Sequence, residues 1–457
     1  MPDALCHSVL LTDLYELTMG AAYFQCNLHR ATASFELFVR NLPQHRGFLL
    51  MAGLEQAVDF LEKLHFEPDE IEYLRRHPMF KRVPPEFFDY LADLRFTGEV
   101  WAMPEGTPVF GDEPLLRVTA PIVEAQIVET YLLATLTFQT MIATKAARLV
   151  EAAQGRDVVD FGTRRAHGPE AGVLAARAAY VGGCVGTSNV EAGVRFGIPT
   201  LGTVAHSFIM AYGDEERAFR DFANLFPENV VLLVDTYDTM AAIEKIIRSG
   251  LRPRGVRLDS GNLAELSQQV RQRLDAAGLR DTRIFVSGDL DEFAITRLLA
   301  QDAPADLFAV GTALVTSKDA PALGGVYKLV EVHEQHAAQA RMLPRYTAKF
   351  SADKFSYPGS KQVFRFSDGQ CYSHDVLACA GESYPEGEPL LEPVMRAGKR
   401  LRPAPALPAI REQARDKVCR LHATVRELHS PARYAVQVSE ELQKLLEQVR
   451  KETIGAS

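Results

Sequence analysis

The sequence predicts an α/β protein whose central part is a barrel of alternating strands and helices. Seven short apolar runs, rich in β-branched residues, recur there at intervals of about 17 to 30 residues. This spacing suits a strand, a helix and two short loops, and seven or more such units in series favour a barrel over an open sheet. The runs are VVDFGTRR from Val158, GGCVGTSN from Gly182, PTLGTVAHS from Pro199, VVLLVDTYDT from Val230, GVRLDSG from Gly255, RIFVSGD from Arg283 and LFAVGT from Leu307.

The rest of the chain predicts a second domain. At 457 residues the chain is too long for one ordinary core. The strand and helix alternation fills residues 151–330 and stops there, so we expect residues 1–150 and 331–457 to pack together as an α+β domain. Its expected elements are helices over much of 10–100, three strand-like pieces in 96–121, a linking helix over 122–152, a strand pair near 363–372 and an amphipathic helix over 439–451.

Composition excludes several classes of protein. Apolar residues at 47%, charged residues at 24% and a net charge of −9 are typical of a globular protein and argue against sequence-independent nucleic-acid binding. No run of 18 apolar residues free of charge predicts a membrane span, and the first residues do not have the pattern of a signal peptide. Six scattered cysteines favour buried thiols over a disulfide framework, so we expect a reducing cytoplasm.

Three residues in the tail have a spacing that zinc sites also use. Cys371, His374 and Cys379 form a C-x2-H-x4-C pattern, but no fourth ligand is evident nearby. A structural role is therefore the favoured interpretation, and zinc binding is the alternative.

Polar residues end the predicted barrel strands, where such barrels carry their active sites. The set combines cations, carboxylates and hydroxyls, which suits an anionic substrate rich in hydroxyl groups. Its members are Arg164, Arg165, Thr187, Ser188, Asn189, His206, Asp235, Asp238, Asp259, Ser287, Asp289 and Thr312.

His206 is the sharpest catalytic candidate. A histidine can be phosphorylated by ATP at one ring nitrogen if a carboxylate holds the other, and Asp235 ends the adjacent predicted strand. The alternative is a core histidine bonded to a backbone carbonyl. Its place at a strand end among carboxylates favours the catalytic interpretation.

The aspartates offer two possible roles. Asp235, Asp238 and Asp259 could accept hydrogen bonds from ribose hydroxyls or help hold a magnesium diphosphate, or they could cap the helices that follow. Asp238 fits capping and binding equally well. Asp259 fits ligand contact better, because Arg257 lies two residues earlier on the same face of its strand and can meet a diphosphate.

Other predicted strand ends suit two parts of a substrate, a phosphate and a planar aromatic acid. Ser287-Gly288 and Gly311-Thr312 close the last two strands, where barrels frequently bind phosphate through backbone N–H groups; tight turns are the alternative. Phe161 stands beside the cations Arg164 and Arg165, a combination suited to a planar aromatic acid.

At these residues the chain resembles the nicotinate phosphoribosyltransferases. The motifs are Thr12-Asp13-Leu14-Tyr15, FGTRRAHGPE, VGTSN, GTVAHSF, VDTYD, VRLDSGNL, AVGTALV and GGVYKLVE, in order over nearly the whole length. The resemblance implies an incomplete β/α barrel beside an α+β domain. It also implies transfer of phosphoribose from 5-phosphoribosyl diphosphate to nicotinate, with Mg²⁺, and with ATP hydrolysis coupled through a phosphohistidine.

The resemblance also implies roles for individual residues. His206 would be phosphorylated beside Asp235, Phe161 and Tyr15 would sandwich the pyridine ring, and Tyr15 would come from the other subunit of a homodimer. Further binding residues would be Thr203 and Arg257 at the nicotinate and phosphoribosyl site, Asp259 at the ribose, and Gly311 and Thr312 at the 5-phosphate.

One position separates close relatives. Nicotinamide phosphoribosyltransferases have an aspartate where this chain has Ser188, and a carboxylate there would repel a substrate carboxylate. Ser188 therefore favours nicotinate. The alternatives are transfer to nicotinamide, transfer to quinolinate without ATP, and a ligand sensor without turnover, which the retained His206, Asp235 and Asp259 disfavour.

Overall fold

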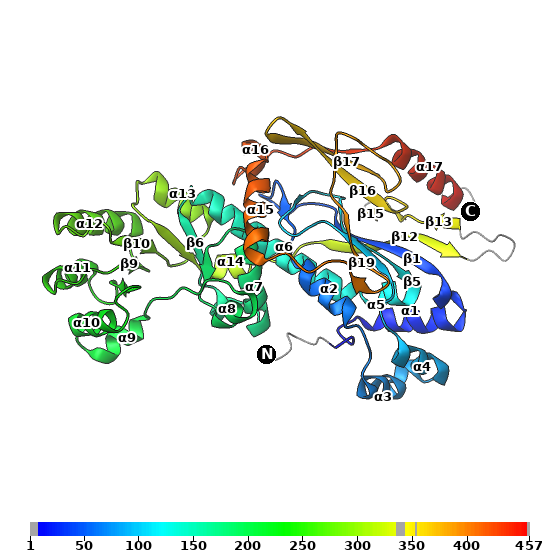
Figure 1. Cartoon of the computed structure of the whole chain (residues 1–457), viewed down its shortest axis with the longest axis horizontal. Coiled ribbons are helices and arrows are strands. Elements are labelled where there is room, and N and C mark those ends of the chain that lie inside the picture. Colours follow the sequence, from blue (N-terminus) through cyan, green and yellow to red (C-terminus); the bar gives the residue numbers. More distant parts are fainter. Residues whose placement is uncertain (1–7, 335–342, 352–353, 455–457) are drawn as a thin grey trace. The chain divides into compact units, whose positions relative to one another are not determined.

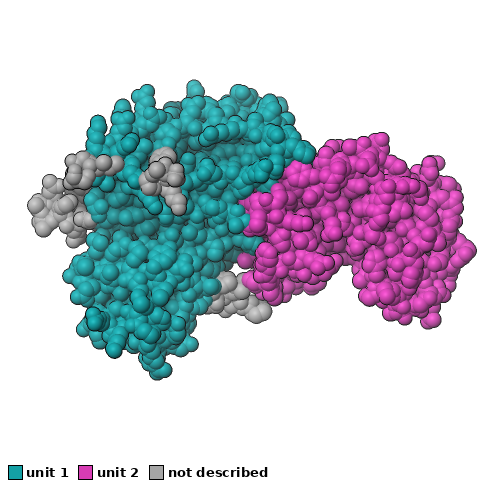
Figure 2. Space-filling view, turned by 180° about the vertical axis from the view of Figure 1, so that it is seen from behind, with its two compact units in different colours: residues 1–140, 322–457 teal, residues 141–321 magenta. Residues whose placement is uncertain are grey.

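The structure, a computed structural model, describes residues 8–334, 343–351 and 354–454. The chain divides into two compact units (Figures 1 and 2). Unit 1 consists of residues 1–140 and 322–457, and unit 2 of residues 141–321. The expected boundaries at 150 and 330 lie about ten residues further along, because the linking helix continues into unit 2.

Unit 2 is built on a parallel sheet whose strand order is β7-β6-β11-β10-β9-β8. The order has two free ends, β7 and β8, so the barrel is incomplete, and the expected fold class is confirmed. Its strands are mostly buried, as parallel strands covered by helices are. They are β6 (Asp157–Asp160), β7 (Gly186–Thr187), β8 (Val231–Leu233), β9 (Gly255–Leu258), β10 (Arg283–Val286) and β11 (Leu307–Val310).

The third predicted strand is wrong. The run from Pro199 makes only one isolated bridge, between Thr200 and Thr187, and His206 begins a helix instead of ending a strand. Its partner β7 has only two residues, and Leu201 is 40% exposed, so neither a long ladder nor a buried face supports a strand here.

Short loops lead from each strand of unit 2 into a helix. Asn189 and Asp238 cap helices with their side chains, accepting from the N–H groups of Ala192 at 2.9 Å and Ala241 at 2.7 Å. The helical segments are η3 (Thr163–Arg165), α7 (Pro169–Val181), α8 (Val190–Phe196), α9 (His206–Tyr212), α10 (Glu215–Leu225), α11 (Thr239–Arg248), α12 (Leu263–Ala276), α13 (Glu292–Ala300) and α14 (Thr312–Val315).

Unit 1 joins both ends of the chain in one antiparallel sheet, ordered β13-β12-β1-β5-β3-β19-β20. Strand β1, from the N-terminal part, pairs along its length with β12, from the C-terminal part, which confirms the α+β domain formed by the two ends. The strands are β1 (Thr32–Val39), β3 (Glu99–Ala102), β5 (Pro114–Pro121), β12 (Gly325–Glu334), β13 (Leu343–Tyr346), β19 (Glu392–Arg396) and β20 (Lys399–Arg400).

Smaller sheets and helices complete unit 1. The four-stranded sheet contains β18 (Glu388–Pro389), β16 (Lys361–Asp368), β17 (Cys371–Cys379) and β21 (Val436–Val438); the two-stranded ones pair β2 (Leu49–Leu50) with β4 (Pro108–Val109) and β14 (Phe350–Ser351) with β15 (Lys354–Phe355). The helical segments are α1 (Leu14–Gln25), η1 (Leu28–Arg30), α2 (Leu54–Glu62), α3 (Pro68–Arg76), η2 (Pro78–Phe80), α4 (Pro85–Asp93), α5 (Ile122–Ile127), α15 (Leu407–Cys419), α16 (Ala423–Arg426) and α17 (Glu440–Ile454); α6 (Glu129–Ala152) spans both units.

The zinc alternative fails on geometry. Cys371 and Cys379 are the two ends of strand β17, and nine residues of strand place them about 25 Å apart. His374 stacks on Phe366 instead, with ring centroids 4.7 Å apart. Within the described part of the chain, no cluster of three or more ligating side chains suits a metal ion, and no helix is long and apolar enough to span a membrane.

Candidate active site

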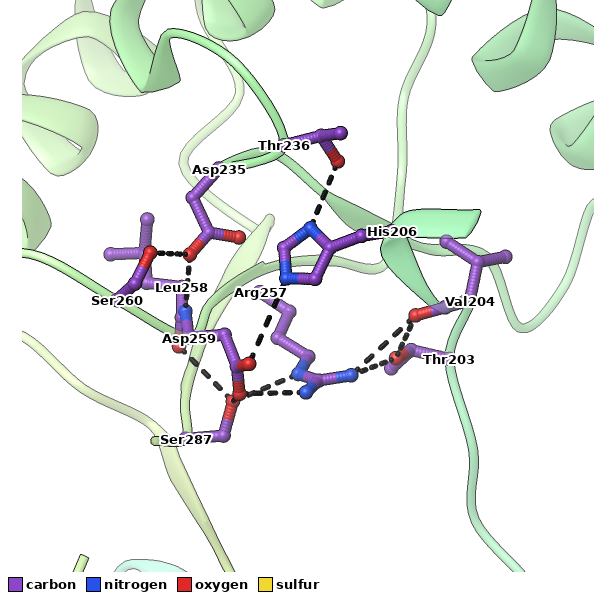
Figure 3. A network of polar contacts seen from close by, with 10 residues as sticks. All are labelled: Thr203, Val204, His206, Asp235, Thr236, Arg257, Leu258, Asp259, Ser260 and Ser287. Atoms are coloured by element: carbon purple, nitrogen blue, oxygen red, sulfur yellow. Dashed lines mark hydrogen bonds and ion pairs between the residues drawn. The ribbon is translucent and has the colours of Figure 1, made fainter. Parts of the chain in front are cut away.

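The carboxyl ends of β8, β9 and β10, with the segment before α9, bring polar side chains into one network (Figure 3). Arg257 is its centre. The guanidinium donates from Nε to Ser287 Oγ at 2.8 Å, from Nη1 to Thr203 Oγ1 at 2.9 Å and from Nη2 to Asp259 Oδ1 at 2.7 Å. Partners on three segments hold the planar group in one orientation, as a binding site for an anion requires.

Asp259 is held ionised within this network. Burial raises the pKa of its carboxyl, but hydrogen bonds from Ser287 and Arg257 outweigh burial and keep the pKa below its ordinary value. The side chain is still 30% exposed, so a ligand can reach it. Asp259 is therefore a charged acceptor suited to hydroxyl groups.

His206 lies between Thr236 and Asp259. Its Nδ1 is 3.1 Å from Thr236 Oγ1, and its Nε2 is 3.8 Å from Asp259 Oδ2. The ring is 40% exposed. The alternative of a core histidine bonded to a backbone carbonyl does not describe this ring.

Asp235 has a different place from the one expected. No hydrogen bond joins it to His206; its Oδ2 accepts from the backbone N–H of Asp259 at 2.9 Å and from Ser260 Oγ at 2.6 Å. Its Oδ1 is buried and, among the described residues, has no hydrogen-bond partner. The chain bends at Thr236 after β8 ends at Leu233, and in this bend Thr236 reaches the ring whereas its neighbour Asp235 does not.

Thr236 is the contact that sequence reasoning missed. It stands inside the VDTYDT run, one residue from a predicted site residue, so its position was a usable signal. The sequence alone does not single out the Thr236 hydroxyl, because threonine is common at strand ends for structural reasons.

The ends of β6 and β7 supply an aromatic face and polar neighbours. The Phe161 ring centroid is 5.7 Å from Arg257 Cζ, which joins this residue to the network. Ser188 is partly buried, and its N–H donates to the backbone oxygen of Asp160 at 2.8 Å. Arg164 and Arg165 lie in η3 with exposed side chains, which have no polar partner in the described chain.

The glycines at strand ends permit close backbone approaches. Gly288 has φ +97°, and a Cβ there would stand 2.0 Å from the backbone oxygen of Asp259. Gly311 precedes the four-residue helix α14, which begins at Thr312. Gly288 thus belongs to the construction of the Asp259 site.

Other expected residues lie outside this network. Asp238 and Asn189 are helix caps, and Asp289 is an exposed residue with φ 48° in the turn after β10. Tyr15 belongs to unit 1, where it is 47% exposed at the start of α1. Unit 2 by itself therefore assembles an imidazole, a guanidinium and two carboxylates suited to a substrate with phosphates and hydroxyls.

Comparisons with known proteins agree with this chemistry. Family models match three stretches of the chain. The N-terminal domain of nicotinate phosphoribosyltransferase matches residues 10–137, the C-terminal domain of quinolinate phosphoribosyl transferase matches 142–320, and the C-terminal domain of nicotinate phosphoribosyltransferase matches 381–446.

Known relatives and solved structures extend over almost the whole chain. Nicotinate phosphoribosyltransferase pncB2 of Mycobacterium tuberculosis is 46% identical over 441 residues, covering 95% of this chain and 92% of the relative. The human nicotinate phosphoribosyltransferase is 32% identical, with 96% of each chain covered. A crystal structure of the human protein aligns with a TM-score of 0.82 at 29% identity, covering 96% of this chain and 100% of that one.

A second solved structure has the same fold. The nicotinate-nucleotide pyrophosphorylase of Pyrococcus furiosus aligns with a TM-score of 0.72 at 27% identity, covering 92% of this chain and 99% of that one. Family models thus match both units, and the alignments with these relatives cover 95% and 96% of the chain. The chain belongs to the nicotinate phosphoribosyltransferase family.

Proposed function

We propose that this chain is a nicotinate phosphoribosyltransferase of NAD biosynthesis, forming nicotinate mononucleotide and diphosphate from nicotinate and 5-phosphoribosyl 1-diphosphate. The Arg257 and Asp259 pair carries the proposal, because it sets an anchored cation beside an ionised acceptor 2.7 Å away at the strand ends. The 46% identity to a mycobacterial enzyme of that name supports it. Catalysis then rests on positioning, since the transition state resembles an oxocarbenium ion and needs no strong nucleophile from the protein.

The residues divide the substrate between them. Asp259 accepts hydrogen bonds from ribose hydroxyls, Arg257 meets the diphosphate, and Phe161 offers its ring face to the pyridine. Gly311 and Thr312 receive the 5-phosphate, in line with the family resemblance. Ser188 leaves room for the substrate carboxylate without repelling it.

ATP is the proposed energy source, and His206 is the proposed phosphoryl acceptor. With the hydrogen on Nε2, facing the ionised Asp259, the Nδ1 lone pair accepts from the Thr236 hydroxyl in the resting site and must give up this hydrogen bond before it can attack. Nδ1 then bonds to the γ-phosphorus of ATP, the bond from phosphorus to the bridging oxygen breaks, and ADP leaves with the electron pair. Asp259 stabilises the positive charge left on the ring, and hydrolysis later restores the imidazole.

Mg²⁺ fits the carboxylates of this site. In phosphate chemistry the ion is usually bound by one or two carboxylates together with substrate phosphates. Asp235, with its buried and unpartnered Oδ1, and Asp259 are the residues that would hold it. When bound, the ion neutralises charge on the departing diphosphate.

The first test measures mononucleotide formation from 5-phosphoribosyl diphosphate and Mg²⁺ with nicotinate, nicotinamide or quinolinate, each with and without ATP. We expect product from nicotinate, stimulated by ATP. Product from another acceptor alone would overturn the substrate, and no product from any acceptor would favour the sensor. Ser188→Asp is expected to weaken nicotinate use and admit some nicotinamide; unchanged selectivity would place the discriminator elsewhere.

A second test addresses the phosphohistidine. We expect label from γ-³²P ATP on the parent protein and on His65→Ala, an exposed histidine of unit 1, but not on His206→Ala. The His206→Ala variant should keep slow transfer that ATP does not stimulate. Equal ATP stimulation in parent and variant would remove His206 from the mechanism.

The homodimer is part of the same proposal, with Tyr15 of one protomer completing the ring site of the other. The 47% exposure of Tyr15 supports a role at a surface that a second copy covers. We expect neither Tyr15→Ala nor His206→Ala alone to show ATP-stimulated transfer. Mixing the two variants should then restore ATP-stimulated activity to about a quarter of the parent sites, because each heterodimer regains one intact site. No recovery in heterodimers verified by mass spectrometry would contradict shared sites.

A further inference from the structure

The carboxylate of Asp160, at the end of β6, connects two segments that carry residues of the proposed nicotinate site. It is fully buried, with 0% of its surface exposed. Its Oδ2 accepts from Thr187 Oγ1 at 2.7 Å, and its Oδ1 accepts from the backbone N–H of Gly162 at 2.8 Å. Thr187 directly precedes Ser188, and Gly162 directly follows Phe161.

The backbone of Asp160 makes the same connection. Its carbonyl oxygen accepts from the N–H of Ser188 at 2.8 Å, while Thr187 Oγ1 accepts from the N–H of Asn189 at 3.0 Å. Asn189 in turn donates from Nδ2 to Thr163 Oγ1 at 3.0 Å. A closed set of hydrogen bonds thus fixes the turn after β6 against the turn after β7.

This arrangement has an energetic cost that calls for a reason. Burial raises the pKa of Asp160 above its ordinary value, against the hydrogen bonds from Thr187 and Gly162. The described contacts give the carboxylate no cation partner. The Thr187 hydroxyl and the Gly162 N–H each donate one hydrogen bond, so the side chain between them must offer two accepting oxygens. A carboxylate offers both, whereas an amide of the same shape offers one.

We infer that Asp160 and Thr187 are positioning residues for the aromatic acid, setting Phe161 and Ser188 at the spacing that nicotinate requires. This inference rests on the proposed function. Neither residue touches the network around Arg257 and Asp259 through a hydrogen bond in the described structure, although the Phe161 ring lies 5.7 Å from Arg257 Cζ. We therefore expect a larger effect on nicotinate than on 5-phosphoribosyl diphosphate.

Asp160→Asn and Thr187→Val test this specificity. Asparagine keeps the shape but can reproduce only one of the two accepting oxygens, and valine removes the hydroxyl at nearly constant volume. We expect each variant to raise the KM for nicotinate about tenfold while leaving the KM for 5-phosphoribosyl diphosphate within about twofold. Thr187→Ser restores the hydroxyl and should restore the parent value.

A matched control lies at the amino ends of the strands of the same sheet, whereas the site lies at their carboxyl ends. Asp306 Oδ2 accepts from the backbone N–H of Ile284 at 2.7 Å, so Asp306→Asn perturbs a carboxylate-to-backbone bond away from the site. Its KM for nicotinate should stay at the parent value. Parallel changes in both KM values, no change in either, or an equal change in the control would overturn the inference.

The experiment separates this inference from the proposed function. A parent protein that makes no mononucleotide from nicotinate refutes the function. An active parent whose variants lack the selective KM change refutes only the positioning role. Thermal unfolding of each variant identifies any that fail to fold, and Thr187→Val tests the same contact if Asp160→Asn is one of them.

Discussion

Replacing Glu16 with glutamine should stabilise unit 1 at neutral and alkaline pH. Glu16 is fully buried at the start of α1, where it contacts Thr12 Oγ1 and Thr130 Oγ1, the latter at 2.7 Å. Each hydroxyl has one hydrogen but a second acceptor: Thr12 lies 3.0 Å from the Ile127 oxygen, and Thr130 lies 2.9 Å from Asp13 Oδ2. Two hydrogens cannot serve four acceptors, so a proton on Glu16 supplies a missing donor.

The magnitude follows from the pKa. Burial, with a smaller contribution from nearby carboxylates, raises the pKa of Glu16 from 4.5 to about 7, against the two threonine hydrogen bonds. In this pH window the folded state keeps a proton that the unfolded state has lost, so the free energy of unfolding falls as pH rises from about 4.5 to about 7 and is then constant. A difference of about 2.5 pH units at about 1.4 kcal/mol each gives a loss of about 3.5 kcal/mol.

Glutamine stays neutral throughout that window. The Glu16→Gln variant should match the parent near pH 4 and exceed it by up to about 3.5 kcal/mol at pH 8. Hydrogen exchange of peptides covering α1, corrected for the intrinsic rate, measures the local opening free energy at each pH. Glu72→Gln, which removes an exposed carboxylate from α3, is the control and should keep the parent slope. Identical slopes for Glu16→Gln and the parent would refute the protonated Glu16.

Three other substitutions test contacts in both units. Gly288→Ala would place a Cβ 2.0 Å from the Asp259 oxygen at φ +97°, so we expect kcat/KM to fall at least tenfold, and parent-like kinetics would refute the tight approach. Arg365→Met leaves the fully buried Asp375 without the ion pair at 2.6 Å, and denaturant unfolding should show a loss of about 3 to 5 kcal/mol; Arg365→Lys should recover part of it. Asp238→Ala removes the cap of α11 and should cost about 1 kcal/mol in unfolding with no change in either KM, whereas a changed KM would restore its ligand role.

The barrel strands could be predicted because a strand buried on both faces is a short run of apolar residues, which is recognisable in the sequence. β9 and β11 are apolar throughout except for Arg257, and each is followed by Gly or Asp at a turn. β1 was missed inside a region expected to be mainly helical, although Asn41, Pro43 and Gly47 follow its sequence TASFELFV as turn residues that could have marked its end. Its stability comes from long-range pairing with β12, almost 300 residues later, which local pattern cannot reveal.

The site was predictable where one strand determines it. Arg257 and Asp259 stand two residues apart on one strand end, and a period of two brings their side chains together. The neighbours of His206 depend instead on three loops, and the choice between Asp235 and Thr236 rests on backbone angles in a turn. A shift of one residue in that turn would bring the Asp235 carboxylate to the His206 ring in place of the Thr236 hydroxyl.

The charges of unit 2 indicate where the phosphates of the proposed substrates would find their partners. Asp235 and Asp259 contribute two carboxylates, and Arg257 already gives one of its bonds to Asp259, so the network alone is not a cationic site. A diphosphate and ATP would add further negative charge, which costs free energy beside partly buried carboxylates unless cations compensate it. Arg164 and Arg165 have guanidinium groups without polar partners in the described chain, after the end of β6, which β11 separates from β10. The unpartnered oxygen of Asp235 would suit a divalent cation carried by the diphosphate, so in the proposed function magnesium and this arginine pair would together supply the positive charge that Arg257 alone cannot.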